Sequence, residues 1–168
     1  QGGRQASDRS GHPDAREIPL HVVGARVEPD EIGACAVLAR RQLLEQIGAL
    51  DEHFFLYWEE TEWCMRAKKA GWRIVHEPAA RVWHKGVKRD YQPQPYVAYY
   101  MTRNRFIMLS KHRAPLAAWL AAWAETLRTL LSYTVRPHWR ARKAIDRAMI
   151  RRGLRDFLRG RSGPLTQP

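Results

Sequence analysis

The segment GALDEHFFLYWEETEWCMRAKKAG, from Gly48 to Gly71, constrains the fold more than any other part of this 168-residue chain. It places large aromatic residues directly beside three carboxylates, Glu59, Glu60 and Glu62. Basic residues follow and lead to a glycine, which favours the position just after a helix. The order therefore predicts a helix over residues 59–70 that ends at Gly71.

The acidic cluster at the start of this helix is a candidate catalytic site. Carboxylates beside apolar rings are costly to ionise, and neighbouring carboxylates raise each other's pKa. Such an environment suits a general base that works near neutral pH. The alternative is a solvated acidic helix start that the helix dipole stabilises. We favour the catalytic interpretation because Trp58 and Trp63 flank the acidic residues, and we expect Glu62 to pair with Arg66.

The positive charge lies in the C-terminal part. The chain has 29 Lys and Arg against 17 Asp and Glu, a net charge of +12. Residues 1–90 hold 14 of each kind, whereas residues 91–168 hold 15 basic and 3 acidic residues. A basic part joined to a neutral one indicates contact with an anionic surface, either lipid headgroups or nucleic acid.

The neutral part has the pattern of a mixed α/β fold. Residues 1–19 are polar and are expected to form a flexible loop. Asp51 is a plausible cap for a short aromatic turn. Cys35 and Cys64 have no metal or redox spacing and are expected to be buried free thiols. Strands are predicted at 18–27, 32–38, 72–76 and 80–83, and helices at 39–47 and 59–70.

The basic part is predicted to be helical. Helices are expected at 96–110, 115–134 and 139–158, with Pro137 as a break and 161–168 as a loose tail. The middle helix is long, but Glu125 and Arg128 near its centre argue against a transmembrane span. One face of that helix carries Leu116, Leu120, Trp123, Leu127, Leu130 and Leu131.

Several motifs in this order resemble the C-terminal half of family 2 glycosyltransferases, and most of all the rhamnosyltransferase-like enzymes of bacterial surface polysaccharides. The resemblance covers about residues 20–163. It rests on Gly33-Ala34-Cys35, Arg40-Arg41, the segment described first with the WRI that follows it, Pro78 with VWHK, YYMTRNR, and RRGLRDFLRGRSG.

The resemblance implies a GT-A fold, an α/β sandwich around a mostly parallel sheet. The N-terminal half of that fold binds the nucleotide and carries an Asp-x-Asp motif, which occurs nowhere in this sequence. Residues 20–95 would then be the acceptor and catalytic half, and residues 96–160 a helical extension on the membrane surface. The nucleotide-binding half would be lost upstream or supplied by another chain, so we expect little activity from the chain alone.

The resemblance also implies roles for particular residues. The general base would be Glu60, where family members commonly have Asp, with Glu59 as its supporting neighbour. His84 would contact the metal and the diphosphate, with Mn²⁺ or Mg²⁺ as the cation and a nucleotide sugar as the donor. The alternative for His84 is a surface or core-edge histidine.

Substrate contacts are expected at five further positions. Gly33 and Ala34 would let the backbone approach the sugar or acceptor, although tight strand packing explains them equally well. Trp58 would stack on a sugar ring. Arg103 and Arg105 would meet a diphosphate or lipid phosphate, or would lie on the exposed face of a basic helix.

The predicted activity is inverting transfer of a hexosyl or deoxyhexosyl unit to a cell-surface polysaccharide or lipid-linked glycan. The protein would lie in the cytoplasm, at the inner face of the cell membrane, through its amphipathic and basic helices. The alternative is a non-catalytic module that binds membranes or nucleic acid. Nucleic acid ranks lower because the aromatic residues lie on the apolar helix, whereas single-strand binders place them in the basic groove.

Overall fold

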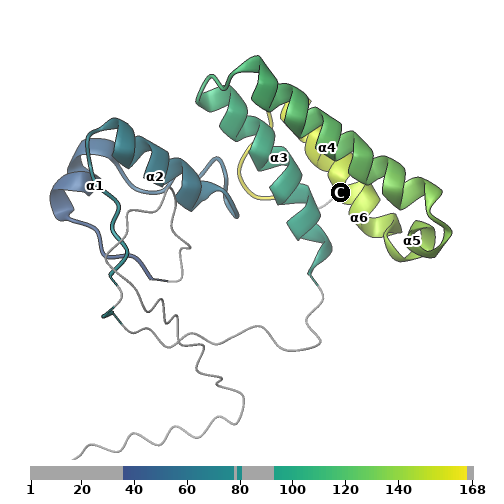
Figure 1. Cartoon of the computed structure of the whole chain (residues 1–168), viewed down its shortest axis with the longest axis horizontal. Helices are drawn as coiled ribbons and strands as arrows, with labels where there is room; N and C mark the ends of the chain where they lie inside the picture. The colour runs from purple at the N-terminus through teal and green to yellow at the C-terminus, as the bar shows by residue number, and fades with distance from the viewer. Residues whose placement is uncertain (1–35, 78, 81–92, 166–168) are drawn as a thin grey trace, which may run out of the picture.

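The computed structural model describes residues 36–77, 79–80 and 93–165 of the chain. In Figure 1, α1 and α2 lie together at one end, while α3, α4 and α6 lie side by side at the other. The helices of the described residues are α1 (Arg41–Ile47), α2 (Glu59–Lys69), α3 (Pro95–Lys111), α4 (Leu116–Val135), α5 (Pro137–Arg142) and α6 (Ala144–Leu158).

The described residues contain no strand, so they do not show the predicted α/β fold. The predicted strand at 72–76 is not formed, because residues 72–75 have no strand pairing and His76 has a single bridge. The Trp72 indole donates to Gln46 of α1 at 2.7 Å and so ties this segment to a helix. The other predicted strands, at 18–27, 32–38 and 80–83, lie wholly or mostly outside the described residues.

Helices α1 and α2 pack on a small core of Leu43, Trp63 and Ala67. The Trp63 indole donates to the carbonyl of Gly48 at 2.9 Å, which joins the middle of α2 to the end of α1. Gly48 has φ 77° and ends α1 in a conformation that favours glycine. Both predicted helices of this part are confirmed.

The C-terminal helices pack around Phe106 of α3. Its ring lies 4.7 Å from that of Trp123 on α4 and 5.4 Å from that of Phe157 on α6. Gly153 lets α6 approach α3 closely, because a Cβ atom there would lie 2.8 Å from the carbonyl oxygen of Tyr99. The glycine is therefore required by packing.

The helices predicted at 96–110 and 115–134 are confirmed, whereas the one predicted at 139–158 is two helices. Helix α5 begins at Pro137, and the backbone turns at Lys143 (φ −106°, ψ 16°) before α6 begins. Arg147 donates to the carbonyl of Tyr133 at 2.8 Å and so braces this corner against α4. A contact between α6 and α4 thus stabilises a break that local periodicity does not reveal.

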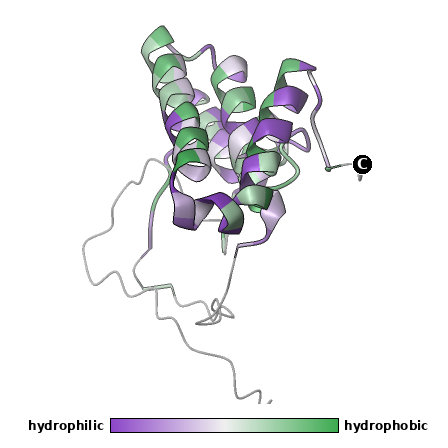
Figure 2. Cartoon of the chain, turned by 90° about the vertical axis from the view of Figure 1, so that its right-hand side faces the viewer, coloured by the Kyte–Doolittle hydropathy of each residue, from purple (hydrophilic) through white to green (hydrophobic). Residues whose placement is uncertain are grey.

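Helix α4 turns much of its apolar face away from the bundle. The buried residues of α4 are Ala122 and Thr126. Figure 2 shows apolar and polar residues interleaved along the helices. No helix in the described ranges is long and apolar enough to cross a bilayer. The exposed leucines of α4, which we call the leucine stripe, are Leu116, Leu120, Leu127 and Leu131, at 73%, 61%, 57% and 63% exposure.

The segment after α6 is held against the rest of the molecule, so the prediction of a loose tail is wrong for residues 161–165. The Gly163 N–H donates to the carbonyl of His53 at 2.8 Å, and the Leu165 N–H donates to the Tyr100 hydroxyl at 2.6 Å. In Figure 1 this yellow segment returns beside α3.

Candidate active site

The loop that leads into α2 has an unusual backbone. Phe55, Tyr57 and Trp58 have φ values of 63°, 64° and 75°, in the left-handed region that residues other than glycine rarely adopt. Asp51 begins the loop with an Asx turn, accepting from the N–H of His53 at 3.0 Å, which agrees with its predicted capping role. Strained residues of this kind persist only where the surroundings hold them, and they gather at functional sites.

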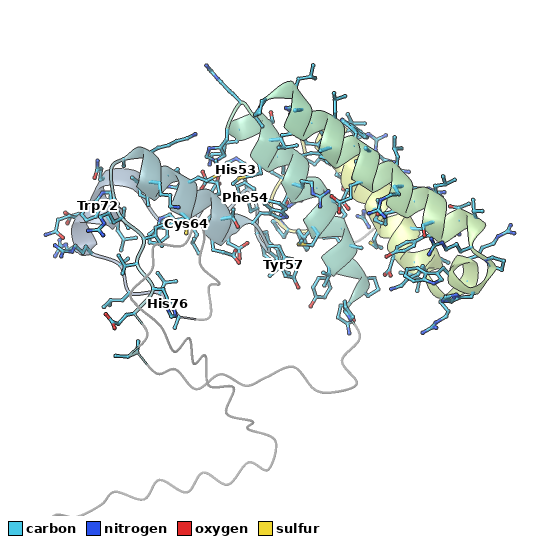
Figure 3. All side chains as sticks on the ribbon, viewed as in Figure 1. His53, Phe54, Tyr57, Cys64, Trp72 and His76 are labelled. Atoms are coloured by element: carbon cyan, nitrogen blue, oxygen red, sulfur yellow. The ribbon has the colours of Figure 1, made fainter. Side chains whose placement is uncertain are left out.

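Asn104 of α3 holds this loop in place. Its amide nitrogen lies 2.8 Å from the carbonyl oxygens of both Phe54 and Leu56, and 2.9 Å from that of Tyr57. Figure 3 shows Phe54 and Tyr57, from the loop that precedes α2, lying between α2 and α3. The buried amide therefore donates hydrogen bonds to carbonyl groups that the left-handed residues direct toward α3.

Arg103 is fully buried beside Asn104, and all five of its N–H groups have protein acceptors. Nε donates to the Asn104 side chain at 2.9 Å. Nη1 donates to the Tyr99 hydroxyl and the Gly163 carbonyl, and Nη2 to the carbonyls of His53 and Phe54, at distances of 3.1, 2.8, 3.4 and 3.1 Å.

The predicted phosphate contact of Arg103 is therefore wrong, because the guanidinium has no donor left for a ligand. The prediction considered an exposed arginine, whereas this side chain is buried at a junction of three segments. Arg105 is partly exposed and pairs with Glu125 of α4 at 2.8 Å. Its contact with a phosphate stays a prediction.

Glu59 and Glu60 lie side by side at the start of α2, both half-buried. The pKa of Glu59 is raised, first by burial and then by the adjacent Glu60 carboxyl group. Among the described residues, Oε2 of each carboxylate and Nε1 of Trp58 are buried without a hydrogen-bond partner. Buried polar atoms of this kind are exceptional in native structures and call for a partner such as water, an ion or a polar ligand.

A groove of about 690 Å³ adjoins Glu59. Its volume is within the range of pockets that bind small molecules. An exposed aromatic ring, Phe55, lines it together with carboxylates and main chain, a set that can stack on a sugar ring and accept hydrogen bonds from hydroxyl groups. The other residues that line it are Leu50, Asp51, Glu52, His53, Ser162, Gly163 and Pro164.

Glu62 is the fully buried carboxylate of the acidic cluster. Its predicted pair with Arg66 is confirmed at 2.7 Å. Lys111 of α3 was not predicted as a partner of Glu62. Its Nζ lies 2.7 Å from Glu62 Oε1, and it also pairs with Asp51. Nothing in the local pattern links these residues, because the pairing joins two helices that are distant in the chain. Glu62 thus joins the two helical parts.

The remaining predicted site residues are Trp58, which is half-buried at the start of α2, and three that lie outside the described residues, namely Gly33, Ala34 and His84. Cys35 also lies outside the described residues, whereas Cys64 is buried, as predicted, and forms no disulfide within the described residues. Within the described ranges, no group of three His, Cys, Asp or Glu side chains could hold a metal ion.

Comparison with known proteins identifies glycosyltransferases as relatives. The N-acetylglucosaminyl-diphospho-decaprenol L-rhamnosyltransferase of Mycobacterium tuberculosis is 27% identical over 175 residues, covering 86% of this chain and 54% of the relative. The dTDP-rhamnosyl transferase RfbF of Shigella flexneri is 30% identical over 87 residues, 47% of this chain and 29% of the relative. The galactofuranosyltransferase GlfT2 of Mycolicibacterium smegmatis is 28% identical over 99 residues, 59% of this chain and 15% of the relative.

The chain is thus a homologue of glycosyltransferases. Its relatives include rhamnosyltransferases, the group that the sequence motifs resemble, so that resemblance is confirmed. The chain spans about half the length of the Mycobacterium tuberculosis rhamnosyltransferase. No protein-family model and no solved structure matches it.

Proposed function

We propose that this chain is the acceptor-side part of an inverting family 2 glycosyltransferase with a GT-A fold. It transfers a hexosyl or deoxyhexosyl unit, such as rhamnosyl, from a nucleotide sugar to a surface polysaccharide or lipid-linked glycan. The observation that carries this proposal is the half-buried Glu59–Glu60 pair, in which Glu59 lines the groove and has a pKa raised by burial and by Glu60.

In the proposed reaction, an acceptor hydroxyl attacks the anomeric carbon of the donor sugar. Glu60 takes the hydroxyl proton as the new glycosidic bond forms, and the bond between the sugar and the nucleotide diphosphate breaks. Glu59 lines the groove as the supporting neighbour of Glu60, and its own pKa is raised by burial and by the Glu60 carboxyl group.

The proposal includes a divalent cation, Mn²⁺ or Mg²⁺, which would neutralise the departing diphosphate. His84 is its proposed ligand and lies outside the described residues. The described residues do not form a ligand set of their own. The role proposed for Glu59 and Glu60 does not depend on the cation.

The leucine stripe supports a membrane location for this activity, at the inner face of the cell membrane. Its four side chains lie on one face of α4, within residues 91–168, which hold 15 basic and 3 acidic residues. Apolar residues that insert among anionic headgroups, with arginines around them, are typical of interfacial helices. The name of the Mycobacterium tuberculosis relative includes a decaprenol diphosphate, which suits a lipid-linked acceptor.

The test is a transfer assay with the longest native polypeptide that contains this chain. Its substrates are dTDP-rhamnose and a polyprenyl-diphospho-N-acetylglucosamine. Glu60→Gln should lower the transfer rate by about 10²- to 10⁴-fold, the usual contribution of a general base. Glu45→Gln, an exposed residue of α1, is the matched control and should keep full activity.

Glu59→Gln completes the assay. A partial loss in this variant agrees with a supporting role beside Glu60. If Glu60→Gln keeps full activity while Glu59→Gln loses it, the base is Glu59 and the assignment to Glu60 is wrong. If both variants transfer sugar at the parent rate, the acidic pair is not the catalytic site.

A further inference from the structure

The Arg103–Asn104 pair lies at the junction of three segments. Helix α3 supplies both residues, the loop at 53–57 supplies four carbonyl groups, and the segment after α6 supplies the carbonyl of Gly163. The loop leads into Glu59, and the segment after α6 lines the groove beside Glu59. Two buried side chains therefore connect the parts of the molecule that shape the proposed site.

We propose that Arg103 and Asn104 are positioning residues, which hold the left-handed loop and the C-terminal segment so that the Glu59 carboxylate faces the groove. This inference rests on the proposed function, because that function makes the groove a substrate-binding site. The hydrogen bonds that carry it are independent of that function.

The geometry at Asn104 shows why an amide is needed. Its nitrogen has two hydrogens and three carbonyl oxygens within 2.9 Å, so one hydrogen is shared between two acceptors. The carbonyls of Phe54, Leu56 and Tyr57 converge on one atom only because the backbone reverses at Phe55 and Tyr57. The amide thus stabilises a conformation that these aromatic residues do not favour alone.

The geometry at Arg103 shows why a guanidinium is needed. A buried charge is tolerated when all of its donors are satisfied, and the planar fork of Arg103 reaches two segments at once. Its Cζ atom lies 5.1 Å from the ring centroids of both Tyr99 and Tyr100, which adds a cation–π contact on each ring. A lysine could supply neither the fork nor five donors.

The C-terminal segment is therefore part of the site. Gly163 accepts from Arg103 through its carbonyl and donates to the carbonyl of His53 through its N–H. These two bonds hold Ser162, Gly163 and Pro164 in the lining of the groove. This segment would therefore contact a ligand bound in the groove, which in the proposed reaction is the acceptor.

The test uses Asn104→Leu, which keeps the approximate size of the side chain and removes its donors. Amide hydrogen exchange over residues 53–58 should rise at least tenfold, while exchange in the middle of α6 stays unchanged. The pKa of Glu59, followed by carbon-13 NMR of its carboxyl group, should fall toward the ordinary glutamate value as the carboxylate turns to water. Ser110→Ala, at an exposed position of α3, should change neither.

Transfer kinetics separate this inference from the proposed function. If the loop is released and kcat falls at least tenfold, with KM for the donor unchanged, both are supported. If the loop is released and transfer is unaffected, the positioning holds and the acidic pair is not the catalytic site. If loop exchange and the pKa of Glu59 match the parent, the positioning role is overturned.

A second variant covers a failure of Asn104→Leu to fold. Deletion of residues 161–168 removes the Gly163 contacts and leaves Asn104 in place. Hydrogen exchange at His53 and Phe54 should then rise, and KM for the acceptor should increase at least threefold. Unchanged exchange in this variant would show that the C-terminal segment has no part in holding the loop.

Discussion

Glu62 and Lys111 form an ion pair of 2.7 Å between the first turn of α2 and the last turn of α3. The carboxylate is fully buried, and Arg66 pairs with its other oxygen at 2.7 Å. The same lysine ammonium also pairs with Asp51 at the start of the aromatic loop. One cation thus neutralises two carboxylates and joins α2, the loop and α3.

Removal of Lys111 should destabilise the protein. Loss of one partner from a buried ion pair costs about 3–5 kcal/mol. Lys111→Met should cost less, about 2 kcal/mol, because water reaches the lysine and Arg66 still compensates Glu62. Urea unfolding followed by circular dichroism measures the change. The control is Arg41→Met, which breaks the exposed pair with Glu45 and should cost less than about 1 kcal/mol. If both variants lose the same unfolding free energy, Lys111 has no special role in stability.

Asp51 should make the stability of the protein depend on acid pH. Burial alone would raise its pKa, but hydrogen bonds from Lys111 and His53, with the Lys111 charge, hold the pKa well below its usual range. A carboxyl group with a lowered pKa contributes stability above its unfolded pKa and loses it as the pH falls toward the folded pKa. The contribution should therefore be complete at neutral pH and decrease below about pH 4.

The comparison of the parent with Asp51→Asn measures this contribution. The difference in unfolding free energy should be about 2 kcal/mol at pH 7 and should shrink steadily between pH 4 and pH 2. Urea unfolding at each pH provides the values. A difference that stays constant over this range would show that the Asp51 carboxylate does not titrate differently in the folded state.

The raised pKa of Glu59 should depend partly on Glu60. Burial is the largest cause of the raised pKa; a backbone hydrogen bond opposes it, and the adjacent Glu60 carboxyl group raises the pKa further. Glu60→Gln removes the neighbouring charge, so the pKa of Glu59 should fall while remaining above its ordinary value because burial persists. Carbon-13 NMR titration of the glutamate carboxyl groups reads this directly. No change in Glu59 would mean that the two carboxyl groups do not interact.

The leucine stripe should mediate binding to anionic bilayers. Leu120→Asn combined with Leu127→Asn should weaken binding to phosphatidylglycerol vesicles at least tenfold without lowering the melting temperature, because both side chains are exposed. Ala121→Asn, an exposed position on α4 outside the stripe, is the matched control. Equal binding by all three proteins in a co-sedimentation assay would exclude this face as the membrane contact.

Local sequence patterns predicted the helices well. The acidic first turn, the basic last turn and Gly71 marked α2, and Pro115 with the apolar spacing after it marked α4. These signals are reliable because capping and helical periodicity act within a few residues. The break at Lys143 was missed because the contact of Arg147 with Tyr133 that braces it comes from another helix.

In the candidate site, too, local patterns predicted some features, whereas others depend on contacts between remote segments. The aromatic and acidic residues of α2, and the pairing of Glu62 with Arg66, follow from neighbours in the chain. Arg103 was expected either to contact a phosphate or to lie on the exposed face of a basic helix, and both expectations need an accessible side chain. Its burial depends on the carbonyls of His53, Phe54 and Gly163, which are remote in sequence.

By itself, the sequence determined the positions of most helices, the acidic cluster and the relationship to glycosyltransferases. Only the tertiary structure decided which charges are buried, which segment lines the groove and where the leucines of α4 point. The physical reason is range: capping and periodicity act over one or two helical turns, whereas burial and hydrogen-bond partners depend on segments brought together by folding.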